Sequence, residues 1–373
     1  MFLKTNTPNI RSQALFWLVL AIIAGVLFFG LRPKNWSGSN NVHWLPEKKA
    51  LSFHDPSIAY VEDVHIFLSS QQPKEWSCQI IVAAANGGKP GFRPLLMIHN
   101  GDDLAQFAFW QWGDAVIVMN GDDYDYSRRL PRLSATHALK PGEVSFLTVT
   151  SGVFGTRLFI NGALVQEIKN WQLTLPDGGD KLRLILGNSV YGKHNWEGEI
   201  YGFAFYATVL TPKKVQLAYD HWLRQKAFAA DVNDDLQLLY SFSEDTGHMV
   251  DDWTGRNQQL HIPARQVVLK KSFLGTPGNN FIFNQSFIVD AVLNLLGFIP
   301  LGAVLYVWLR HALPKQKQYA LLGTVTFCFF LSLGMEISQA WLPSRDSSLS
   351  DLVLNTLGAC LGCLAGKQMK RMG

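Results

Sequence analysis

The sequence predicts a multidomain membrane protein, in which an all-β jelly-roll sandwich is inserted between one N-terminal and three C-terminal transmembrane α-helices. Three observations predict this class. Four apolar runs are long enough, or nearly so, to cross a bilayer. Segments rich in β-branched and aromatic residues fill the long stretch between the first run and the second. Turn residues separate these segments at the spacing of an antiparallel sandwich.

The first apolar run, residues 14–31, follows a short N-terminal segment, residues 1–13, that carries Lys4 and Arg11. A cleaved signal peptide has a shorter apolar region and then a cleavage site flanked by small residues. This run instead ends on two phenylalanines, a glycine and a leucine, and continues into Arg32. We therefore expect an uncleaved membrane anchor.

Three further apolar runs near the C-terminus predict three more membrane helices. They cover residues 287–309, 319–342 and 349–366, and a basic tail, residues 367–373, follows them. Lys and Arg accumulate in the short loops on the cytoplasmic side of a membrane. The N-terminus, the loop after the second run and the tail are basic, whereas the loop after the third run has Arg345 as its single basic residue. We expect both termini to be cytoplasmic in a bacterial inner membrane, with residues 35–270 in the periplasm.

Residues 35–270 are predicted to form the β-sandwich. The strand-like runs include residues 144–150, 156–162, 182–188 and 199–210. Asn-Gly pairs at 100–101, 120–121 and 161–162 are typical of two-residue type I′ hairpins. One helix is expected after the N-cap Thr211, with Pro212 at its first position and an apolar stripe that ends at Trp222. Another strand pair is expected within residues 236–264, and residues 271–285 are typical of a linker back to the membrane.

Polar residues interrupt the three C-terminal apolar runs and form the candidate functional site. A charged side chain near the middle of a membrane helix costs about 2.5–3.5 kcal/mol, so such residues are functional candidates that need partners. Glu336 and Asn355 each lie roughly 9 Å inside a run, so two helices bring polar groups to one level. The i, i+4 spacing places the polar residues of each helix on one face. This predicted cluster, ligand-binding or structural, consists of Asp290, Asn294, Glu336, Gln339, Arg345, Asp351 and Asn355.

Structural explanations for these residues stay open from the sequence alone. Asp351 follows Ser348 at capping-box spacing at the start of a helix. Glu336 lies near the C-terminus of its helix, where the macrodipole disfavours an anion, so it is either neutral or paired, with Arg345 the nearest candidate. A ridge of small residues predicts close helix packing in the last run. The ridge consists of Gly358, Gly362 and Gly366.

Composition indicates which partners, disulfides and metal sites to expect. The net charge of +4 is too small to suggest a nucleic acid partner. Cys78 is the single cysteine of the predicted sandwich, which excludes an internal disulfide there, and we expect neither a metal site nor a cofactor. The acidic turns are candidate calcium ligands in the sandwich, although they match no known loop template, and solvated hairpin tips are the alternative. These turns contain Asp102, Asp103, Asp122, Asp123 and Asp125.

A first resemblance rests on the order of four segments of the sandwich. They are TRLFINGALV from Thr156, LRLILGN from Leu182, a G-x-I-x-x-F-x-x-Y pattern from Gly198 to Tyr206, and LYSFSEDTGHMVDDWTG from Leu239. This order resembles a laminin-G or concanavalin A-like domain. The resemblance implies a jelly-roll sandwich that often binds carbohydrate or protein, sometimes with calcium. The last segment usually opens such domains, which leaves a permuted strand order open.

A second resemblance covers residues 286–366. The stretch from Asp290 to Gly302 reads D-x-x-x-N-x-x-x-F-x-P-x-G, and E-x-x-Q, an arginine and D-x-x-x-N-x-x-G-x-x-x-G follow from Glu336 to Gly362. These motifs resemble the VanZ-like family of bacterial membrane proteins. Some members are associated with resistance to the glycopeptide teicoplanin, and the family's molecular activity is not settled. Residues 14–31 would serve as the family's first helix, although they carry none of its polar marks.

Functional hypotheses from different classes follow. In the first, the protein turns nothing over: the sandwich binds a cell-envelope glycan or a protein partner, and the helices hold an amphipathic ligand among the membrane lipids. A glycolipid, a lipid-linked sugar or a glycopeptide has this character. In the second, an intramembrane enzyme uses Glu336 or Asp351 as general acid or base on a lipid-linked sugar, with Arg345 stabilising a phosphate or carboxylate. The lack of histidine in the cluster and of a nucleophile beside a base favours the first. A third hypothesis is an anchored adhesion or scaffold module.

Overall fold

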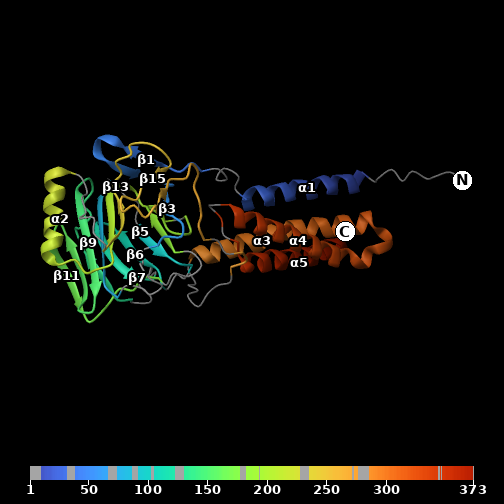
Figure 1. Ribbon diagram of the computed structural model, residues 1–373. Helices are drawn as coiled ribbons and strands as arrows, with labels where there is room; N and C mark the ends of the chain where they lie inside the picture. The colour runs from blue at the N-terminus through green and yellow to red at the C-terminus, as the bar shows by residue number, and fades with distance from the viewer. Residues whose placement is uncertain are drawn as a thin grey trace. The chain divides into compact units, whose positions relative to one another are not determined.

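The computed structural model describes residues 10–31, 38–65, 74–85, 91–101, 105–121, 130–176, 182–192, 194–226, 235–270, 273–275, 285–342, 345 and 347–372. The chain divides into two units, Ser37–Lys270 and Met1–Trp36 with Lys271–Gly373. The first unit is a β-sandwich and the second a helical bundle (Figure 1). The acidic turns named as candidate calcium ligands lie outside the described residues.

The predicted β-sandwich is confirmed, and it consists of two antiparallel sheets. The first sheet has the order β1-β2-β13-β4-β9-β10-β11, with β14 also paired to β13. Its strands are β1 (Val42–Leu45), β2 (Ala50–Phe53), β4 (Trp76–Ala84), β9 (Val144–Gly152), β10 (Gly155–Ile160), β11 (Ala163–Lys169), β13 (Gly198–Tyr206) and β14 (Leu236–Tyr240). The second sheet has the order β15-β16-β3-β12-β5-β6-β7-β8. Its strands are β15 (Met249–Val250), β16 (Leu260–His261), β3 (Ala59–Val61), β12 (Arg183–Leu186), β5 (Arg93–His99), β6 (Phe107–Trp112), β7 (Ala115–Asn120) and β8 (Arg132–Ala135).

Side-chain alternation along the strands builds the core of the sandwich. In β4, Ile80 and Val82 point into the core between the sheets, whereas Ile81 and Ala83 point to the outer face of the first sheet. Both pairs are buried. The strand therefore reads as one continuous apolar run, which is the pattern of a strand covered on both faces.

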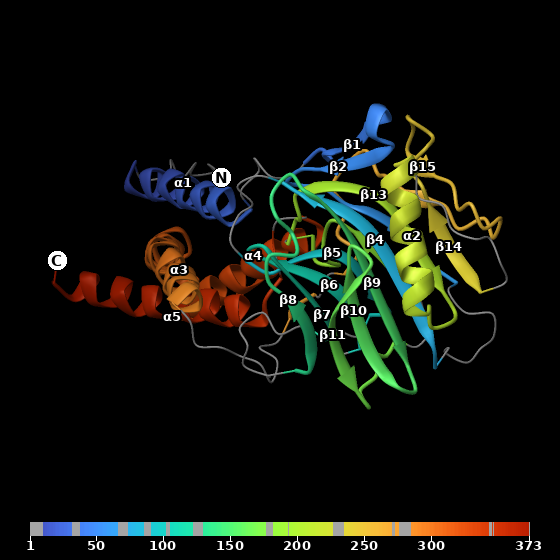
Figure 2. The same cartoon turned by 90° about the vertical axis from the view of Figure 1, so that its left-hand side faces the viewer.

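The outer face of the first sheet is covered by α2 (Pro212–Gln225) (Figures 1 and 2). The hydroxyl of Thr211 accepts a hydrogen bond from the backbone N–H of Lys214 and caps the helix, as predicted. Val215 and Trp222 are buried against the sheet, because they lie seven positions apart on one face of the helix. The 3₁₀ turn η2 (Pro46–Lys48) connects β1 to β2 beside this face.

One of the three predicted type I′ hairpins is present as predicted. Asn161 and Gly162 have φ values of 53° and 80° and connect β10 to β11. The predictions for the other two Asn-Gly pairs were wrong, because β5 ends at His99 and β6 begins at Phe107, while β7 ends at Asn120 and β8 begins at Arg132. The strands of these two pairs are antiparallel neighbours, but longer connections join them.

The last segment of the sandwich contributes to both sheets. After α2, β14 pairs with β13 of the first sheet, and β16 then pairs with β3 of the second. β14 thus pairs with the strand that precedes it in the sequence, whereas β16 lies beside a strand from much earlier in the chain.

The second unit consists of α1 (Ile10–Leu31), α3 (Gln285–Ala312), α4 (Ala320–Trp341) and α5 (Leu349–Met372). A 3₁₀ segment, η3 (Pro314–Tyr319), joins α3 to α4. Among the described residues, four helical spans are long and apolar enough to cross a membrane, one N-terminal and three C-terminal. These four spans fit a multi-pass membrane protein, as the sequence predicted.

Glycines bring the backbones of α3 and α5 together. A Cβ atom added at Gly362 would lie 2.2 Å from the carbonyl oxygen of Ile299, and one at Gly358 would lie 2.3 Å from that of Leu295. The approach is reciprocal, since a Cβ at Gly302 of α3 would lie 2.3 Å from a carbonyl oxygen of α5. Side chains at these positions would hold the two backbones apart.

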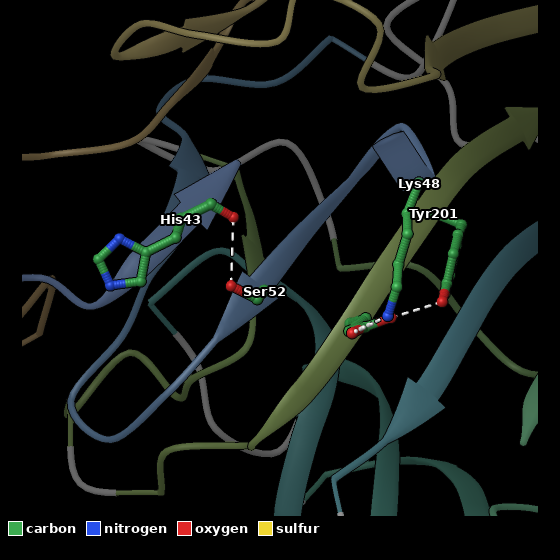
Figure 3. Close-up of polar contacts among 5 residues, drawn as sticks. His43, Lys48, Ser52 and Tyr201 are labelled. Carbon is green, nitrogen blue, oxygen red and sulfur yellow. Dashed lines mark hydrogen bonds and ion pairs between the residues drawn. The ribbon is translucent and has the colours of Figure 1, made fainter. Parts of the chain in front are cut away.

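An ion pair connects the η2 turn to β13 in the sandwich. The ammonium of Lys48 lies 2.7 Å and 3.0 Å from the two carboxylate oxygens of Glu199. The hydroxyl of Tyr201 donates to the same carboxylate at 2.5 Å, and the side chains converge in Figure 3. Burial raises the pKa of Glu199, but the bonds from Lys48 and Tyr201 outweigh it and lower that pKa below its usual range.

We expect Glu199→Gln to destabilise the sandwich by about 0.5–1 kcal/mol at neutral pH, a small effect because the Lys48 partner is exposed to solvent. The folded-state pKa lies below the unfolded one, so this stabilisation is present above the unfolded pKa and is lost as pH falls through the folded pKa. Thermal unfolding followed by tryptophan fluorescence should therefore separate the variant from wild type at pH 7, and the difference should shrink as the pH falls through the folded-state pKa of Glu199. The exposed Glu143 is the control, and an equal loss in Glu143→Gln would contradict a specific role for Glu199.

Candidate functional site

The candidate site lies where α4 ends and α5 begins. α4 carries Glu336 and Gln339 on its buried face, and α5 carries Asp351 and Asn355 in its first turns. α3, which begins at Gln285, carries Asp290 and Asn294 in its N-terminal part. Glu336, Gln339 and Asn355 are buried, whereas Asp290 is exposed. The name polar cluster below means the seven predicted residues Asp290, Asn294, Glu336, Gln339, Arg345, Asp351 and Asn355.

Glu336 is bound to the N-terminus of the neighbouring helix. Its Oε2 accepts a hydrogen bond from the backbone N–H of Ser348, at 2.7 Å, and the Ser347 side chain also donates to its carboxylate. Ser348 immediately precedes α5, so the carboxylate lies at the positive end of the α5 dipole. A carboxylate near the C-terminus of α4 is unfavourable for the dipole of α4, and the positive end of the α5 dipole compensates for this. Arg345, the partner named from the sequence, donates to the carbonyl oxygen of Phe29 at 3.1 Å.

The cap provided by Glu336 changes the role of Asp351. The hydroxyl of Ser348 accepts from the backbone N–H of Asp351 at 3.4 Å, which is one half of the predicted capping box. The other half, a carboxylate bound to the N–H of Ser348, comes from Glu336. The Asp351 carboxylate instead accepts a hydrogen bond from the Asn294 side chain and lies within electrostatic range of Asp290. The two D-x-x-x-N motifs therefore meet across α3 and α5.

α1 contributes backbone atoms to this end of the bundle. Gln339 donates from Nε2 to the carbonyl oxygen of Gly30 at 3.0 Å, beside the Phe29 carbonyl that binds Arg345. The last carbonyl groups of a helix lack intrahelical partners and carry the negative end of its dipole, so they suit these donors. α1 contributes no polar side chain to the cluster, as the sequence predicts, and its contribution comes from backbone carbonyl groups at its C-terminus, which no residue type marks.

Asn355 has an unused hydrogen-bonding atom. Its Nδ2 donates to the hydroxyl of Ser332 at 2.9 Å, and both side chains are buried. Its Oδ1 is buried and has no hydrogen-bond partner in the described part of the protein. A buried polar atom without a partner costs about 1–3 kcal/mol. A donor group supplied by a ligand would remove this cost.

The segment that follows the sandwich is attached to the α4–α5 loop. The backbone N–H of Leu274 donates to the hydroxyl of Ser347 at 3.0 Å, and that of Gly275 donates to the Ser347 carbonyl at 2.9 Å. The N–H of Leu349 donates back to the Gly275 carbonyl at 3.2 Å. The loop that binds Glu336 therefore also binds the start of the linker. This contact could not be predicted from the sequence, because both segments are short and irregular.

Acceptors outnumber donors in the polar cluster. It contains three carboxyl groups and one guanidinium group, together with three amides. No set of three His, Cys, Asp or Glu side chains in the described ranges is arranged to hold a metal ion. The cluster therefore presents mainly hydrogen-bond acceptors, which suit hydroxyl or amine donors.

Comparison with known families agrees with the two-part architecture. Residues 237–369 match the VanZ/LLP1 family model, and residues 64–216 match the model of the concanavalin A-like lectin/glucanases superfamily. The chain therefore combines a VanZ-like C-terminal part with a concanavalin A-like domain. The VanZ match begins inside β14, ahead of the predicted start of the membrane part at residue 286.

Solved structures resemble the chain only distantly. The CBM40 module of Ruminococcus gnavus IT-sialidase, bound to alpha2,3 sialyllactose, is 13% identical with a TM-score of 0.33, and the match covers 39% of this chain and 83% of that one. The binding domain of botulinum neurotoxin DC, in complex with SialylT, is 14% identical with a TM-score of 0.33, over 49% of this chain and 45% of that one. None of the curated proteins compared matches the chain.

Proposed function

We propose that this protein is a bacterial inner-membrane protein that binds cell-envelope molecules without turning them over. Its concanavalin A-like domain binds a glycan on the periplasmic side. Its VanZ-like bundle holds the headgroup of a glycolipid, lipid-linked sugar or glycopeptide in the outer leaflet. The distribution of Lys and Arg among the short loops supports this orientation, with both termini in the cytoplasm.

The meeting of the two D-x-x-x-N motifs carries the proposal for the bundle. Because Glu336 caps α5, the carboxylate of Asp351 is not needed for capping and lies beside Asp290 and Asn294 at the surface of the bundle. Polar groups are costly in a membrane helix, so a carboxyl group that its own helix does not need as a cap is a candidate for a ligand contact.

The occupied state of Glu336 supports binding over catalysis. A general acid or base needs access to the proton that it transfers, within hydrogen-bond reach of the substrate. Glu336 is 1% exposed, and its carboxylate is bound to Ser348 and Ser347. These contacts support a role for Glu336 in holding the loop and the start of α5.

Native mass spectrometry of the detergent-purified protein tests the binding role. We expect a lipid or glycolipid to co-purify with the wild type and to be reduced at least about tenfold in Asp351→Asn, because one charged hydrogen-bond acceptor is lost. Thr356→Val is the matched control, since Thr356 lies on the same helix and bonds to the Leu352 carbonyl of its own backbone.

Two results would contradict the proposal. Adducts that are identical in the wild type and Asp351→Asn would make the polar cluster a packing device, and the scaffold hypothesis would then be favoured. Consumption of a lipid-linked sugar by the purified protein, abolished in Glu336→Gln, would favour an enzyme instead.

A further inference from the structure

We infer that the outer face of the second sheet carries a sugar-binding subsite formed by Tyr60, Glu62, Arg183 and His261. The inference rests on the glycan-binding role proposed above and assigns it to one place in the sandwich. Tyr60 and Glu62 flank Val61, which points into the core, so both face outward. His261 pairs with Tyr60 between β16 and β3, and Arg183 begins the neighbouring strand β12.

Tyr60 and His261 form an aromatic surface. Their rings are stacked, with centroids 6.1 Å apart and planes inclined by 29°, and both residues are half-buried. Tyr60 packs against the buried cluster on this face that contains Ile185 and Met97. A ring held by its neighbours loses little conformational freedom when a ligand binds. The face of the Tyr60 ring that is turned away from its neighbours offers an apolar surface to the C–H groups of a pyranose ring, and its hydroxyl remains available for a hydrogen bond.

Polar groups stand beside this surface. The Nη2 of Arg183 lies 3.3 Å from Oε1 of Glu62, which is longer than the usual 2.7–3.2 Å of an N–H···O bond. The Nε of Arg183 is buried and has no hydrogen-bond partner among the described residues. Because Nε itself is enclosed, a ligand would meet the exposed 16% of the Arg183 side chain, whose Nη2 makes the long bond to Glu62.

A second Arg–Glu pair in the same sandwich is closer than the Arg183–Glu62 pair. In the first sheet, the Nε of Arg157 lies 2.6 Å from Oε1 of Glu167 on the adjacent strand. That pair satisfies itself at short distance, whereas the Arg183–Glu62 pair is long and leaves Nε unused. A ligand with neighbouring hydroxyl groups fits the looser pair, because one hydroxyl accepts from the guanidinium while the next donates to the carboxylate.

The phenol of Tyr60 adds a donor to the same place. Burial, and then the charge of Glu62, raise the pKa of Tyr60 above its usual value. The hydroxyl therefore stays protonated at neutral pH. The four side chains together offer a ring face, donors and an acceptor, which is the combination that recognises a carbohydrate rather than a flat apolar ligand.

The test uses the full-length protein in lipid nanodiscs, because maltoside and glucoside detergents would themselves compete as sugars. The probe is a glycan array of pyranose oligosaccharides that includes soluble peptidoglycan fragments. Binding to the glycans that the wild type retains should fall about tenfold or more in Tyr60→Ala and in Arg183→Ala. Tyr60→Phe, which keeps the ring but removes the hydroxyl donor, should lose less binding than Tyr60→Ala, and Glu62→Gln should lose several-fold with little change in side-chain volume.

Arg157→Ala is the matched control, since it removes the self-satisfied pair of the other sheet, and it should leave binding unchanged. The thermal unfolding of each variant is measured to check that the sandwich is intact. If glycans bind but Arg183→Ala and Glu62→Gln bind as the wild type does, the subsite is wrong while the glycan-binding role stands. If the wild type retains no glycan on the array, both the role and the subsite are contradicted.

Discussion

Gly362→Ala is expected to destabilise the helical bundle by about 1–3 kcal/mol, the usual cost of forcing an extra carbon into a tightly packed contact. The new Cβ would lie 2.2 Å from the carbonyl oxygen of Ile299 and 2.7 Å from the backbone nitrogen of Ala303. Backbone atoms cannot rotate aside as a flexible side chain can, so α3 and α5 would have to separate. Thermal unfolding in detergent, followed by circular dichroism, measures the loss.

Gly334→Ala in α4 is the matched control. Nothing lies within 4 Å of a Cβ atom added there. Alanine is a better helix former than glycine by up to about 1 kcal/mol, so this variant should unfold at the same temperature as the wild type or at a higher one. If Gly334→Ala and Gly362→Ala shift the midpoint equally, close backbone contact is not what Gly362 provides.

Glu336→Ala is expected to loosen the start of α5 and to lower the stability of the bundle by about 1–3 kcal/mol. The substitution removes the acceptor for the backbone N–H of Ser348 and leaves that donor in a half-buried place. Glu336→Gln keeps an acceptor oxygen and should lose less. Hydrogen exchange of the amides of residues 347–352, measured by mass spectrometry in detergent, should accelerate in the alanine variant first.

Asp351→Asn provides the comparison, because Asp351 belongs to the polar cluster but does not cap α5 with its side chain. We expect this variant to change ligand retention with little effect on amide exchange. Faster exchange in Asp351→Asn than in Glu336→Ala would reverse the roles that the hydrogen bonds assign to the two carboxyl groups.

The start of the linker and the C-terminus of α1 are both bound within the helical unit. Leu274 and Gly275 bind the same loop that Glu336 holds, and Arg345 and Gln339 bind the carbonyl groups at the end of α1. Both chain segments that lead to the sandwich are thus anchored at the polar end of the bundle. Loosening of the α4–α5 loop in Glu336→Ala should therefore also expose the linker to proteolysis.

Several features followed from the sequence because their causes are local. The continuous apolar runs predicted the four membrane helices, and the β-branched segments predicted the sandwich, since hydropathy and period depend only on neighbouring residues. The cap at Thr211 and the hairpin at Asn161 and Gly162 were predicted from single turns of the chain. The Asn-Gly pairs at residues 100 and 120 misled the prediction, because an Asn-Gly pair permits a tight turn but does not require one when the strands end elsewhere.

In the polar cluster, too, the features with a local cause were predicted and those that depend on tertiary contacts were not. The i, i+4 spacing of Asp351 and Asn355 is a property of one helix, and the sequence alone determined that their side chains share a face. Which carboxylate caps α5 was decided by tertiary structure, because Glu336 and Ser348 are brought together only when α4 and α5 pack side by side. The same holds for the carbonyl groups of Phe29 and Gly30, which are distant in sequence from the side chains that bind them. Local order is encoded in adjacent residues, whereas the partner of a buried charge depends on which helix ends meet in the folded protein.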